Sequence, residues 1–564
     1  MLLRHFVETY LLLSPTCLST KVQQFYKKLH LHFWESKKTF DARRKGITLQ
    51  YRNRDQFLSN MLHPSKNLFP NRVAELFQDK TILITGGTGF LGKVLIEKLL
   101  RTCSSLKKIY VIIREKNEKN ATKRLQEICD GPLFEKLRQQ KGATIFDKIE
   151  AIDGDVIAPD LGLSETDRQK LIQETEIIYH SAASIKFDEP LKSAVLLNVR
   201  GTKSMLELAE ECKNLVVFCH LSTAYCHEKQ EVLLDTLYPP PADPHCMIKL
   251  CECMNEETLS AIDSTIRGWS ANNYTFSKAL TEALVEEKMD KLPVVIQRPT
   301  AIIPTWKEPI PGWTDNINGP MGLLIGAGKG VIRTMYAKDD AILDCLPVDS
   351  VINLLICSTY DYVTYRSRRV YNLTISREVK VTANKLLETG RQVINTKIPF
   401  DMVIWYPNGS LKSSRLSHYI HFLLFQLLPA FFIDAIFLLI GVKPFLIRVQ
   451  KKVLKGYQIF EYYVNREWDF RHDNMSIFRD YLNPREREEF IMDPEGFDFH
   501  TYITDCMLGA RRYILKEPDD GISSALKRMK MLWLLDKVCK IVFTTGILYY
   551  MCKFFLFIYS NKVN

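Results

Sequence analysis

The sequence lacks the features that mark several classes of protein. Its fourteen cysteines include no paired C-x-x-C spacing. The densest group, Cys246, Cys251 and Cys253 with His245, therefore indicates ordinary thiols rather than a zinc site. No basic, aromatic-interleaved motif argues for nucleic acid, and a net charge of +11 is modest for 564 residues. With 25% charged and 46% hydrophobic residues, the composition is that of an ordinary folded protein, and we expect a reducing compartment.

The N-terminal part also lacks a long hydrophobic run. Its apolar run Tyr10–Leu13 is too short to span a bilayer, and no clear cleavage site follows it. Residues 1–54 carry eleven Lys/Arg against three Asp/Glu. We interpret residues 1–75 as a basic extension: a targeting arm, a disordered segment, or sequence before a true start at Met61.

The most informative stretch begins at Thr81. Thr81–Thr85 is β-branched and apolar, as a buried strand should be, and Gly86, Gly89 and Gly92 follow before an apolar-periodic helix. Glycine suits these positions because the chain must turn tightly, approach a pyrophosphate and pack helix against strand. The helix N-terminus offers free N–H groups to that pyrophosphate. The stretch predicts a dinucleotide site, against the alternative of a glycine-rich turn without a ligand.

Further strand-like runs place other candidate residues. Runs at 81–85, 109–113, 149–152, 176–179, 215–221 and 294–297 alternate with helical patterns, which predicts an α/β fold with a Rossmann-like, doubly wound parallel sheet. Ligands bind at the carboxyl ends of such strands. Arg114 ends the second strand, where arginine accommodates a 2′-phosphate, so NADPH is favoured over NADH. Asp155 follows the third strand and either meets the adenine or is a solvated loop residue.

Tyr274 and Lys278 are four residues apart in a predicted helix and therefore share one face. A neighbouring ammonium is expected to lower the pKa of the phenol from about 10 toward neutrality, so that Tyr274 can exchange a proton with a carbonyl oxygen. Lys278 can also hold the nicotinamide ribose. Ser222 or Thr223, after the fifth strand, adds a hydroxyl for the same carbonyl. The sequon Asn273–Thr275 lies in this helix, where a glycan would be intolerable, which favours a cytosolic placement.

Residues 78–375 resemble the reductase domain of the fatty acyl-CoA reductases, alcohol-forming members of the extended short-chain dehydrogenase/reductase family. The resemblance rests on Thr85–Gly92, His180–Glu189, Leu221–Tyr225, Tyr274–Lys278, Gln297–Thr300 and Leu346–Asp349, and continues through Lys443–Pro444, Gly456–Asn465, Phe497–Tyr502 and Gly509–Tyr513. It implies NADPH-dependent reduction of a long-chain fatty acyl-CoA to a primary fatty alcohol, through a bound aldehyde. The long N-terminal arm departs from the family pattern, as does Thr300, where members often carry serine.

The resemblance also implies roles for residues. The catalytic set is Tyr274, Lys278 and, by position in the family pattern, Thr223 in preference to Ser222. Arg298–Thr300 would cover the nicotinamide side, and no metal is expected. The candidate cofactor-binding residues are Thr85, Gly86, Gly87, Thr88, Gly89, Phe90, Leu91, Gly92, Arg114, Asp155, Val156, Ala182, Ala183, Tyr274, Lys278, Arg298, Pro299 and Thr300.

The expected domains are an NADPH-binding reductase domain at 76–375, a mainly helical C-terminal domain at 376–530 and a membrane tail at 531–564. Within the second, residues 419–442 are apolar but contain Asp434, and a central aspartate disfavours insertion by about 2.5–3.5 kcal/mol. We favour a membrane-lying hairpin or an acyl-chain channel wall there, with a plain buried helix as the close alternative.

Within the tail, residues 541–559 approach the length of a bilayer span, with a peripheral amphipathic segment as the alternative. A tail anchor would leave the catalytic domain facing the cytosol, on the endoplasmic reticulum or the peroxisome. The expected partners are a long-chain acyl-CoA and a membrane lipid surface; the oligomeric state stays open, a homodimer included. Two other functions are considered: a membrane-bound sterol or hydroxysteroid dehydrogenase, which would resemble this chain only in the sheet domain, and a non-catalytic dinucleotide-sensing scaffold, which would usually lack the tyrosine or the lysine.

Overall fold

The computed structural model describes residues 69–563 except 367, 375–377, 472–479 and 493, and it gives only the backbone of Phe555 and 557–563. The contacts within the chain separate residues 1–69 from one compact unit, Pro70–Asn564. The predicted basic extension, with Tyr10–Leu13 and Met61, therefore lies almost entirely outside the described residues.

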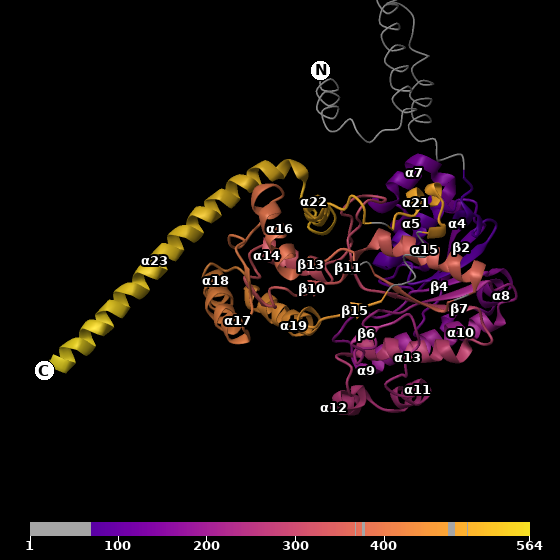
Figure 1. The fold of residues 1–564 in the computed structure, drawn as a ribbon, viewed down its shortest axis with the longest axis horizontal. Coiled ribbons are helices and arrows are strands. Elements are labelled where there is room, and N and C mark those ends of the chain that lie inside the picture. The colour runs from indigo at the N-terminus through magenta and orange to yellow at the C-terminus, as the bar shows by residue number, and fades with distance from the viewer. Residues whose placement is uncertain (1–68, 367, 375–377, 472–479, 493, 564) are drawn as a thin grey trace, which may run out of the picture. The chain divides into compact units, whose positions relative to one another are not determined.

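A seven-stranded parallel sheet, in the order β12-β7-β5-β4-β1-β2-β3, forms the centre of this unit (Figure 1). Six strands match predicted runs: β1 (Thr81–Thr85), β2 (Lys108–Ile113), β3 (Ile149–Asp153), β4 (Ile177–His180), β5 (Val217–Leu221) and β7 (Val294–Pro299). The seventh, β12 (Val370–Leu373), has only four residues and was not predicted; it pairs with β7 in parallel. The order changes direction between β1 and β4, so the predicted doubly wound fold is confirmed.

Helices cover both faces of the sheet. Along β1 the side chains alternate, so that Ile82 and Ile84 join one apolar layer and Leu83 joins the other. The first layer contains α5 (Phe90–Thr102) and α15 (Val348–Tyr365), and the second contains α10 (Gly201–Glu211) and α13 (Asn273–Lys288). Since every residue of β1 is buried, the loops at the carboxyl ends of the strands are where a ligand can reach the sheet.

The C-terminal part is mainly helical, as predicted. Its helices are α16 (Ala383–Thr396), α17 (Arg415–Phe422), α18 (Leu428–Leu439), α19 (Leu446–Val464), α21 (Pro484–Glu489), α22 (Phe499–Gly509) and α23 (Ile522–Val563). A separate apolar cluster joins α16 and α22 to α14 (Pro320–Gly328). The chain also returns to the sheet, because Glu486 of α21 accepts a 2.7 Å hydrogen bond from Nη2 of Arg72. The sheet and the C-terminal helices thus belong to one body.

The two apolar stretches near the C-terminus are both helical. Among the described residues, one helical run, Arg415–Leu439, is long and apolar enough to cross a membrane, with a mean hydropathy of 2.3. Only 22% of its most apolar window is buried, so the alternative of a plain buried helix is wrong. In α23, residues 541–554 are helical and largely exposed, whereas most side chains from 555 to 559 lie outside the described residues. The span predicted at 541–559 remains a prediction.

Candidate active site

A cavity of about 850 Å³ extends from the glycine turn after β1 to the C-terminal helices. It passes the ends of β2, β4, β5 and β7, the edge at which the fold predicts a ligand. Its lining includes Gly86, Arg114, Tyr274 and Lys278 as well as apolar residues more than a hundred positions further along the chain. The structure therefore brings the predicted motifs to one site.

The glycine turn forms the first end of this cavity. Gly86 has φ +73°, and a Cβ atom there would lie 2.7 Å from Oγ of Ser181 and 2.8 Å from the backbone nitrogen of Ala182. A Cβ atom on Gly92 would lie 2.3 Å from the carbonyl oxygen of Gly86. The turn thus has no room for side chains, and α5 begins immediately after it with no side-chain cap. Its N-terminal N–H groups suit a pyrophosphate, so this turn fits a dinucleotide.

Two residues of the predicted fingerprint do not line the cavity. Thr85 is fully buried, and its Oγ1 lies 2.7 Å from Nδ1 of His180. Gly87 faces the interior, where a Cβ atom would lie 2.4 Å from Cγ1 of Val111. Both residues thus support the turn on its interior side, away from the cavity. The other fingerprint residues, Gly86 and Thr88–Gly92, line the cavity.

The ends of β2 and β3 add a cationic region. Arg114 lines the cavity, and its Nη1 lies 3.6 Å from Oδ2 of Asp155. Asp155 and Val156 also line the cavity, so Asp155 is not simply a solvated loop residue. Lys116 and Arg124 lie at the same end and were missed, although the density of lysine and arginine after β2 was a usable signal. The three cations make this end suitable for a phosphate group.

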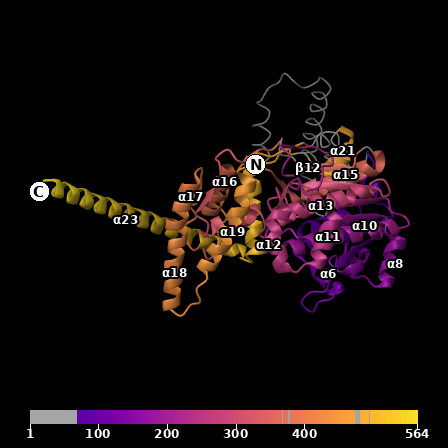
Figure 2. The same ribbon diagram turned by 90° about the horizontal axis from the view of Figure 1, so that it is seen from below.

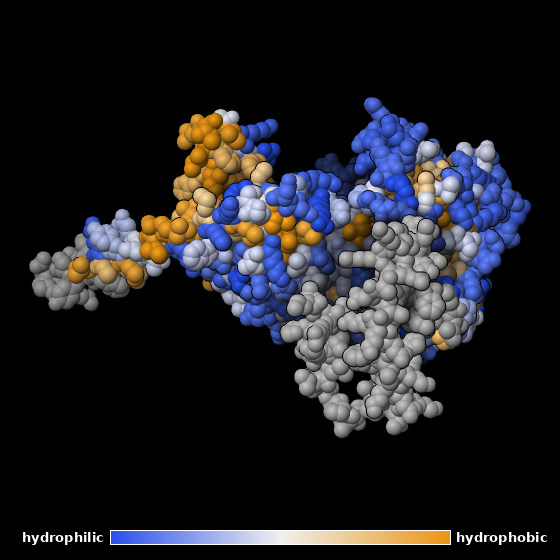
Figure 3. Space-filling view, turned by 90° about the horizontal axis from the view of Figure 1, so that it is seen from above, coloured by the Kyte–Doolittle hydropathy of each residue, from blue (hydrophilic) through white to orange (hydrophobic). Residues whose placement is uncertain are grey.

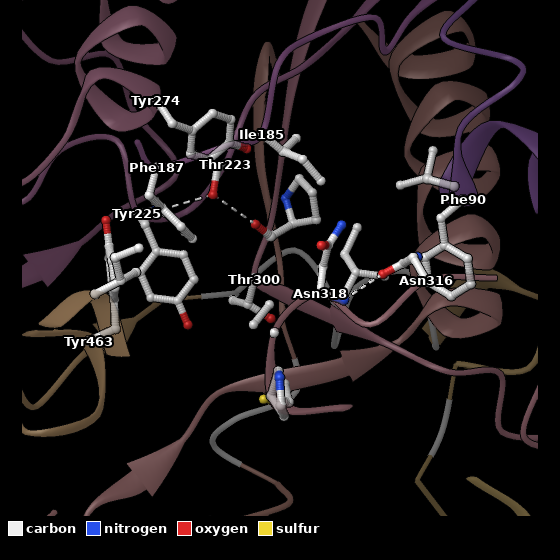
Figure 4. Close-up of a pocket in the computed structure, with 18 of the residues that line it drawn as sticks. Phe90, Ile185, Phe187, Thr223, Tyr225, Tyr274, Thr300, Asn316, Asn318 and Tyr463 are labelled. Carbon is white, nitrogen blue, oxygen red and sulfur yellow. Dashed lines mark hydrogen bonds between the residues drawn. The ribbon is translucent and has the colours of Figure 1, made fainter. Parts of the chain in front are cut away.

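The predicted tyrosine stands at the start of α13. Asn272 caps this helix by accepting a 3.0 Å hydrogen bond from the backbone of Thr275, which places Tyr274 in the first turn. The Thr223 side chain lies near the Tyr274 hydroxyl, close enough to counteract part of the rise in the pKa of Tyr274 (Figure 4). Its own hydrogen bonds are to the carbonyl oxygen of Pro299 at 3.5 Å and from the backbone N–H of Tyr225 at 3.4 Å. The hydroxyl of Ser222 lies 3.6 Å from Sγ of Cys226 instead. The geometry therefore favours Thr223 over Ser222 as the partner of Tyr274.

The predicted effect of Lys278 on the tyrosine is wrong for this arrangement. Burial raises the pKa of Tyr274, whereas the prediction was a lowered value. Nζ of Lys278 donates a 2.6 Å hydrogen bond to the carbonyl oxygen of Leu221, and burial lowers the pKa of this lysine to about 8. Removing both groups from water disfavours their charged forms, and this effect outweighs their proximity on the helix.

The role predicted for Arg298 also needs correction. Arg298 does not line the cavity: its Nε and Nη2 atoms donate hydrogen bonds of 2.9 and 2.6 Å to Glu282, one further turn along α13 from Lys278. Neighbouring strand residues point to opposite faces, which explains why Pro299 faces the cavity and Arg298 does not. Thr300, Ala182 and Ala183 also line the cavity, as predicted.

Glu282 is the centre of a buried polar cluster that the sequence did not reveal. Nε2 of His227 lies 2.7 Å from its carboxylate, and Sγ of Cys226 lies 3.3 Å from it. Nearby Cys226 and Glu282 raise the pKa of His227 to about 10 despite its burial. In the described part of the chain this is the one group of three side chains close enough to hold a metal ion. Because Arg298 already neutralises the carboxylate, we infer that the cluster stabilises α13 rather than binding a metal ion.

The far end of the cavity is apolar, and both the sheet-bearing part and the C-terminal part contribute to it. The ring of Phe187 packs against that of Tyr274, with centroids 5.8 Å apart (Figure 4). Ring contacts continue from Phe187 to Tyr463, from Tyr463 to Tyr225 and from Tyr225 to Trp468. Beyond them the lining includes Leu324, Ile332, Met335, Leu386, Leu411 and Phe460. Sequence reasoning missed these residues because they are spread over 137 positions and share no motif.

Comparisons with known proteins agree with this geometry. A family model described as "Male sterility protein" matches residues 84–355, where it represents an NAD-binding domain, and a second model with the same description matches residues 425–517. "Fatty acyl-CoA reductase 1" of Homo sapiens is 35% identical over 464 residues, which are 82% of this chain and 89% of that protein. "Fatty acyl-CoA reductase wat" of Drosophila melanogaster is 34% identical over 485 residues, 85% of this chain and 93% of that protein.

Among solved structures, the reductase domain of a nonribosomal peptide synthetase from Mycobacterium tuberculosis has a TM-score of 0.51 at 18% identity. The match covers 79% of this chain and 96% of that one. This likeness supports the fold alone, a Rossmann-like sheet that continues into a helical C-terminal part. The identity and coverage of the sequence relatives go further, and they show that this chain belongs to the fatty acyl-CoA reductases, oxidoreductases of the extended short-chain dehydrogenase/reductase family.

Proposed function

We propose that the protein reduces a long-chain fatty acyl-CoA to the primary alcohol with NADPH, through an aldehyde that stays bound. The observation that carries this proposal is the single cavity. It joins a dinucleotide turn, a tyrosine with a threonine beside it, and an apolar end whose lining suits a hydrocarbon chain. The names of the relatives supply the substrate class, an acyl-CoA.

The choice of NADPH over NADH rests on the cationic end of the cavity. Arg114, Lys116 and Arg124 line the region beyond the glycine turn where the adenosine half of a dinucleotide fits. A 2′-phosphate can pair with these cations, and a 2′-hydroxyl would leave them without that partner. Asp155 pairs with Arg114 and so holds the guanidinium at the cavity wall.

NADPH, when bound, would supply hydride to the carbonyl carbon. The protein stabilises the negative charge on the carbonyl oxygen and supplies the proton. Tyr274 and Thr223 place two hydroxyls where the oxyanion develops, and Tyr274 transfers its proton to that oxygen. The resulting hemithioacetal returns the proton to Tyr274 as the C–S bond breaks and coenzyme A leaves as the thiolate. A second NADPH, bound after the first has left as NADP⁺, would supply the hydride that reduces the aldehyde, and Tyr274 protonates the alkoxide. The raised pKa of Tyr274 favours the protonated phenol that this role requires.

We further propose that the C-terminal tail anchors the enzyme in a membrane with the site in the cytosol, on the endoplasmic reticulum or the peroxisome. The described part of the tail exposes apolar residues such as Ile541, Val542, Leu548 and Phe554. Long acyl chains and alcohols partition into lipid, so a site at the bilayer surface shortens their path.

A membrane assay tests the proposed reaction. Membranes that contain the full chain receive NADPH and a series of acyl-CoAs, and chromatography follows the products. We expect fatty alcohol with about two NADPH consumed per alcohol. Accumulating aldehyde, with one NADPH per product, would overturn the four-electron reaction, and NADH used equally well would overturn the cofactor choice.

The two alternative functions are less well supported. A sterol or hydroxysteroid dehydrogenase would resemble this chain only in the sheet domain, whereas a family match also covers residues 425–517. A non-catalytic scaffold would not need both Tyr274 and Lys278, and here both line the cavity.

A further inference from the structure

The C-terminal part contains a helical hairpin, residues 415–464, whose first arm is α17 with α18 and whose second arm is α19. Asp434 in the first arm accepts backbone hydrogen bonds from Phe445, Leu446 and Ile447, at 3.0, 2.9 and 2.8 Å. The aspartate that weighs against membrane insertion is therefore saturated by the N-terminus of the second arm. The chain then returns, and Tyr457 and Val464 are buried. The first arm turns back rather than crossing a bilayer.

The first arm is apolar on its outer surface. Figure 2 shows α18 projecting away from the sheet, and Figure 3 shows a continuous hydrophobic surface on a projecting part of the molecule. Leu439, near the tip, is 85% exposed. The other exposed apolar residues of this surface are Leu416, Tyr419, Ile420, Leu423, Leu424, Phe425, Leu428, Phe431, Phe432, Ile436, Leu438, Ile440, Val442 and Phe445. A surface of this size indicates a binding site.

The second arm is cationic on its outer surface. Arg448, Lys451, Lys452 and Lys455 are all exposed on α19, and Lys443 is exposed at the turn. Acidic side chains are few in the hairpin: Asp434 is buried, and Glu461 pairs with Arg415 at 2.6 Å. An apolar arm beside a cationic arm complements a bilayer with anionic headgroups better than it complements another protein's surface.

The middle of the hairpin contacts the apolar end of the cavity directly. Oε1 of Gln426 accepts a 2.9 Å hydrogen bond from the backbone of Arg333, which lines the cavity. Nε2 of Gln426 donates to Gln450 at 2.7 Å, and Gln450 in turn donates to the carbonyl oxygen of Val331 at 3.3 Å. Buried amides thus fix both arms to the segment that forms the cavity wall.

We infer that this hairpin is a second membrane-binding element, which inserts its first arm into one leaflet of an anionic bilayer and rests its second arm on the headgroups. It adds to the membrane contact of the tail, which the first arm meets where the rings of Phe425 and Phe543 lie 6.2 Å apart, and it holds the acyl end of the cavity at the lipid surface. This inference goes beyond the proposed reaction and does not depend on it, because lipid binding is measured without turnover.

Vesicle flotation of the full chain tests the inference. The parent carries Ile541→Lys and Leu548→Lys, which weaken the tail. The apolar variant adds Phe432→Gln, Ile436→Gln and Leu439→Gln, and the charge variant adds Lys451→Gln, Lys452→Gln and Lys455→Gln. Vesicles contain phosphatidylcholine alone or three parts phosphatidylcholine to one part phosphatidylserine. A control variant removes three exposed lysines of the sheet domain, Lys141, Lys213 and Lys249.

We expect the apolar variant to bind both kinds of vesicle about tenfold or more weakly than the parent. We expect the charge variant to bind the phosphatidylserine vesicles about tenfold more weakly than the parent and to bind vesicles of phosphatidylcholine alone as well as the parent does. The control variant should bind both kinds of vesicle like the parent. Equal binding by parent and apolar variant would overturn the inference. A charge variant with no loss on phosphatidylserine vesicles would overturn the anionic specificity. If the apolar variant dissociates a dimer but floats like the parent, the surface joins two copies and the inference fails.

A second measurement covers the case in which the apolar variant does not fold. Phe432→Trp in the parent adds one fluorophore to the exposed surface of the first arm. Lipids brominated in their acyl chains should quench the added emission relative to the parent. Emission that is not quenched would show that this arm stays out of the hydrocarbon.

Discussion

Nε and Nη2 of Arg298 donate hydrogen bonds of 2.9 and 2.6 Å to the two carboxylate oxygens of Glu282, and both side chains are almost completely buried. The pair joins the end of β7 to the helix that carries Tyr274 and Lys278. His227 approaches the same carboxylate. The helix is thus fixed by charges that lie outside the cavity.

Removing the carboxylate from this pair should destabilise the protein. Glu282→Gln leaves a buried guanidinium without its counter-charge, and we expect a loss of about 3–5 kcal/mol in the free energy of unfolding. Glu287→Gln, on the same helix, is the matched control, because Glu287 is exposed and its ion pair among the described residues is with His245. Thermal unfolding in detergent measures the stability of both variants. Equal melting temperatures of Glu282→Gln and Glu287→Gln would contradict a supporting role for Glu282.

The two hydroxyls at the end of β5 should differ in importance. Thr223→Val removes the hydroxyl beside Tyr274, and we expect kcat to fall by about 10²-fold, the size seen when one oxyanion donor is lost. Ser222→Ala should change kcat by less than about threefold, since its hydroxyl lies beside Cys226. The reverse order of effects would assign the donor to Ser222.

Loss of the phenol should be more severe. Tyr274→Phe is expected to abolish measurable turnover, because proton transfer to the substrate oxygen depends on this hydroxyl. Its binding of NADPH, followed by fluorescence quenching, should stay within about threefold of wild type, since the ring is retained. Turnover retained in this variant would show that the proton comes from another group.

Lys278 should make stability depend on pH in a defined window. Burial lowers its pKa from 10.5 to about 8, so between these values the unfolded chain binds more protons and stability rises with pH. The contribution is fully present above pH 10.5 and is lost as the pH falls through 8. Relative to Lys278→Met, wild type should gain about 3 kcal/mol from pH 8 to pH 10.5. If the difference in stability between wild type and Lys278→Met does not change with pH, the pKa of Lys278 is not lowered by folding.

A methyl group on Gly86 should block the dinucleotide site. In Gly86→Ala, a left-handed residue gains a Cβ atom 2.7 Å from Ser181, so backbone strain and a clash add together. Gly142→Ala separates the two effects, because Gly142 has φ +78° but no atom within 4 Å of the added carbon. We expect both variants to lose about 1 kcal/mol or more of stability, and only Gly86→Ala to lose NADPH binding.

Cofactor choice should depend on the cations after β2. Arg114→Ala should raise KM for NADPH by about tenfold and leave KM for NADH nearly unchanged, because only NADPH carries the 2′-phosphate. Arg138→Ala is the control: Arg138 is partly exposed and pairs with Asp130 away from the cavity. Equal effects of Arg114→Ala on both cofactors would assign Arg114 to a structural role.

Local patterns predicted much of the fold and part of the site. Thr81–Gly92 specified strand, turn and helix because each step has a strict steric requirement, and Gly86 meets it with φ +73°. β12 was missed because four residues that include Asn372 carry little periodicity. Arg298 was misplaced because a motif gives the position of a residue along the chain, whereas strand pleating decides which face it occupies.

The electrostatics could not be read from spacing. The helical register of Tyr274 and Lys278 was predicted correctly. The direction of the pKa shift of Tyr274 depends on its burial, and Lys278 donates to the carbonyl oxygen of Leu221 on β5, which spacing along the helix does not reveal. The apolar end of the cavity could not be predicted from the sequence either. Its residues come from several helices and loops that only the tertiary fold brings together.

One contact bears on how the enzyme can be divided. Nδ2 of Asn272, the residue that caps the helix of Tyr274 and Lys278, donates a 2.6 Å hydrogen bond to the hydroxyl of Tyr463, almost two hundred positions later on α19. Shortening the chain to its nucleotide-binding half would remove this partner of the cap residue, together with Phe460 and Tyr463 of α19 from the cavity wall, and would open the cavity to water. The smallest working catalyst therefore includes α19, and chimaeras between relatives should exchange both halves together.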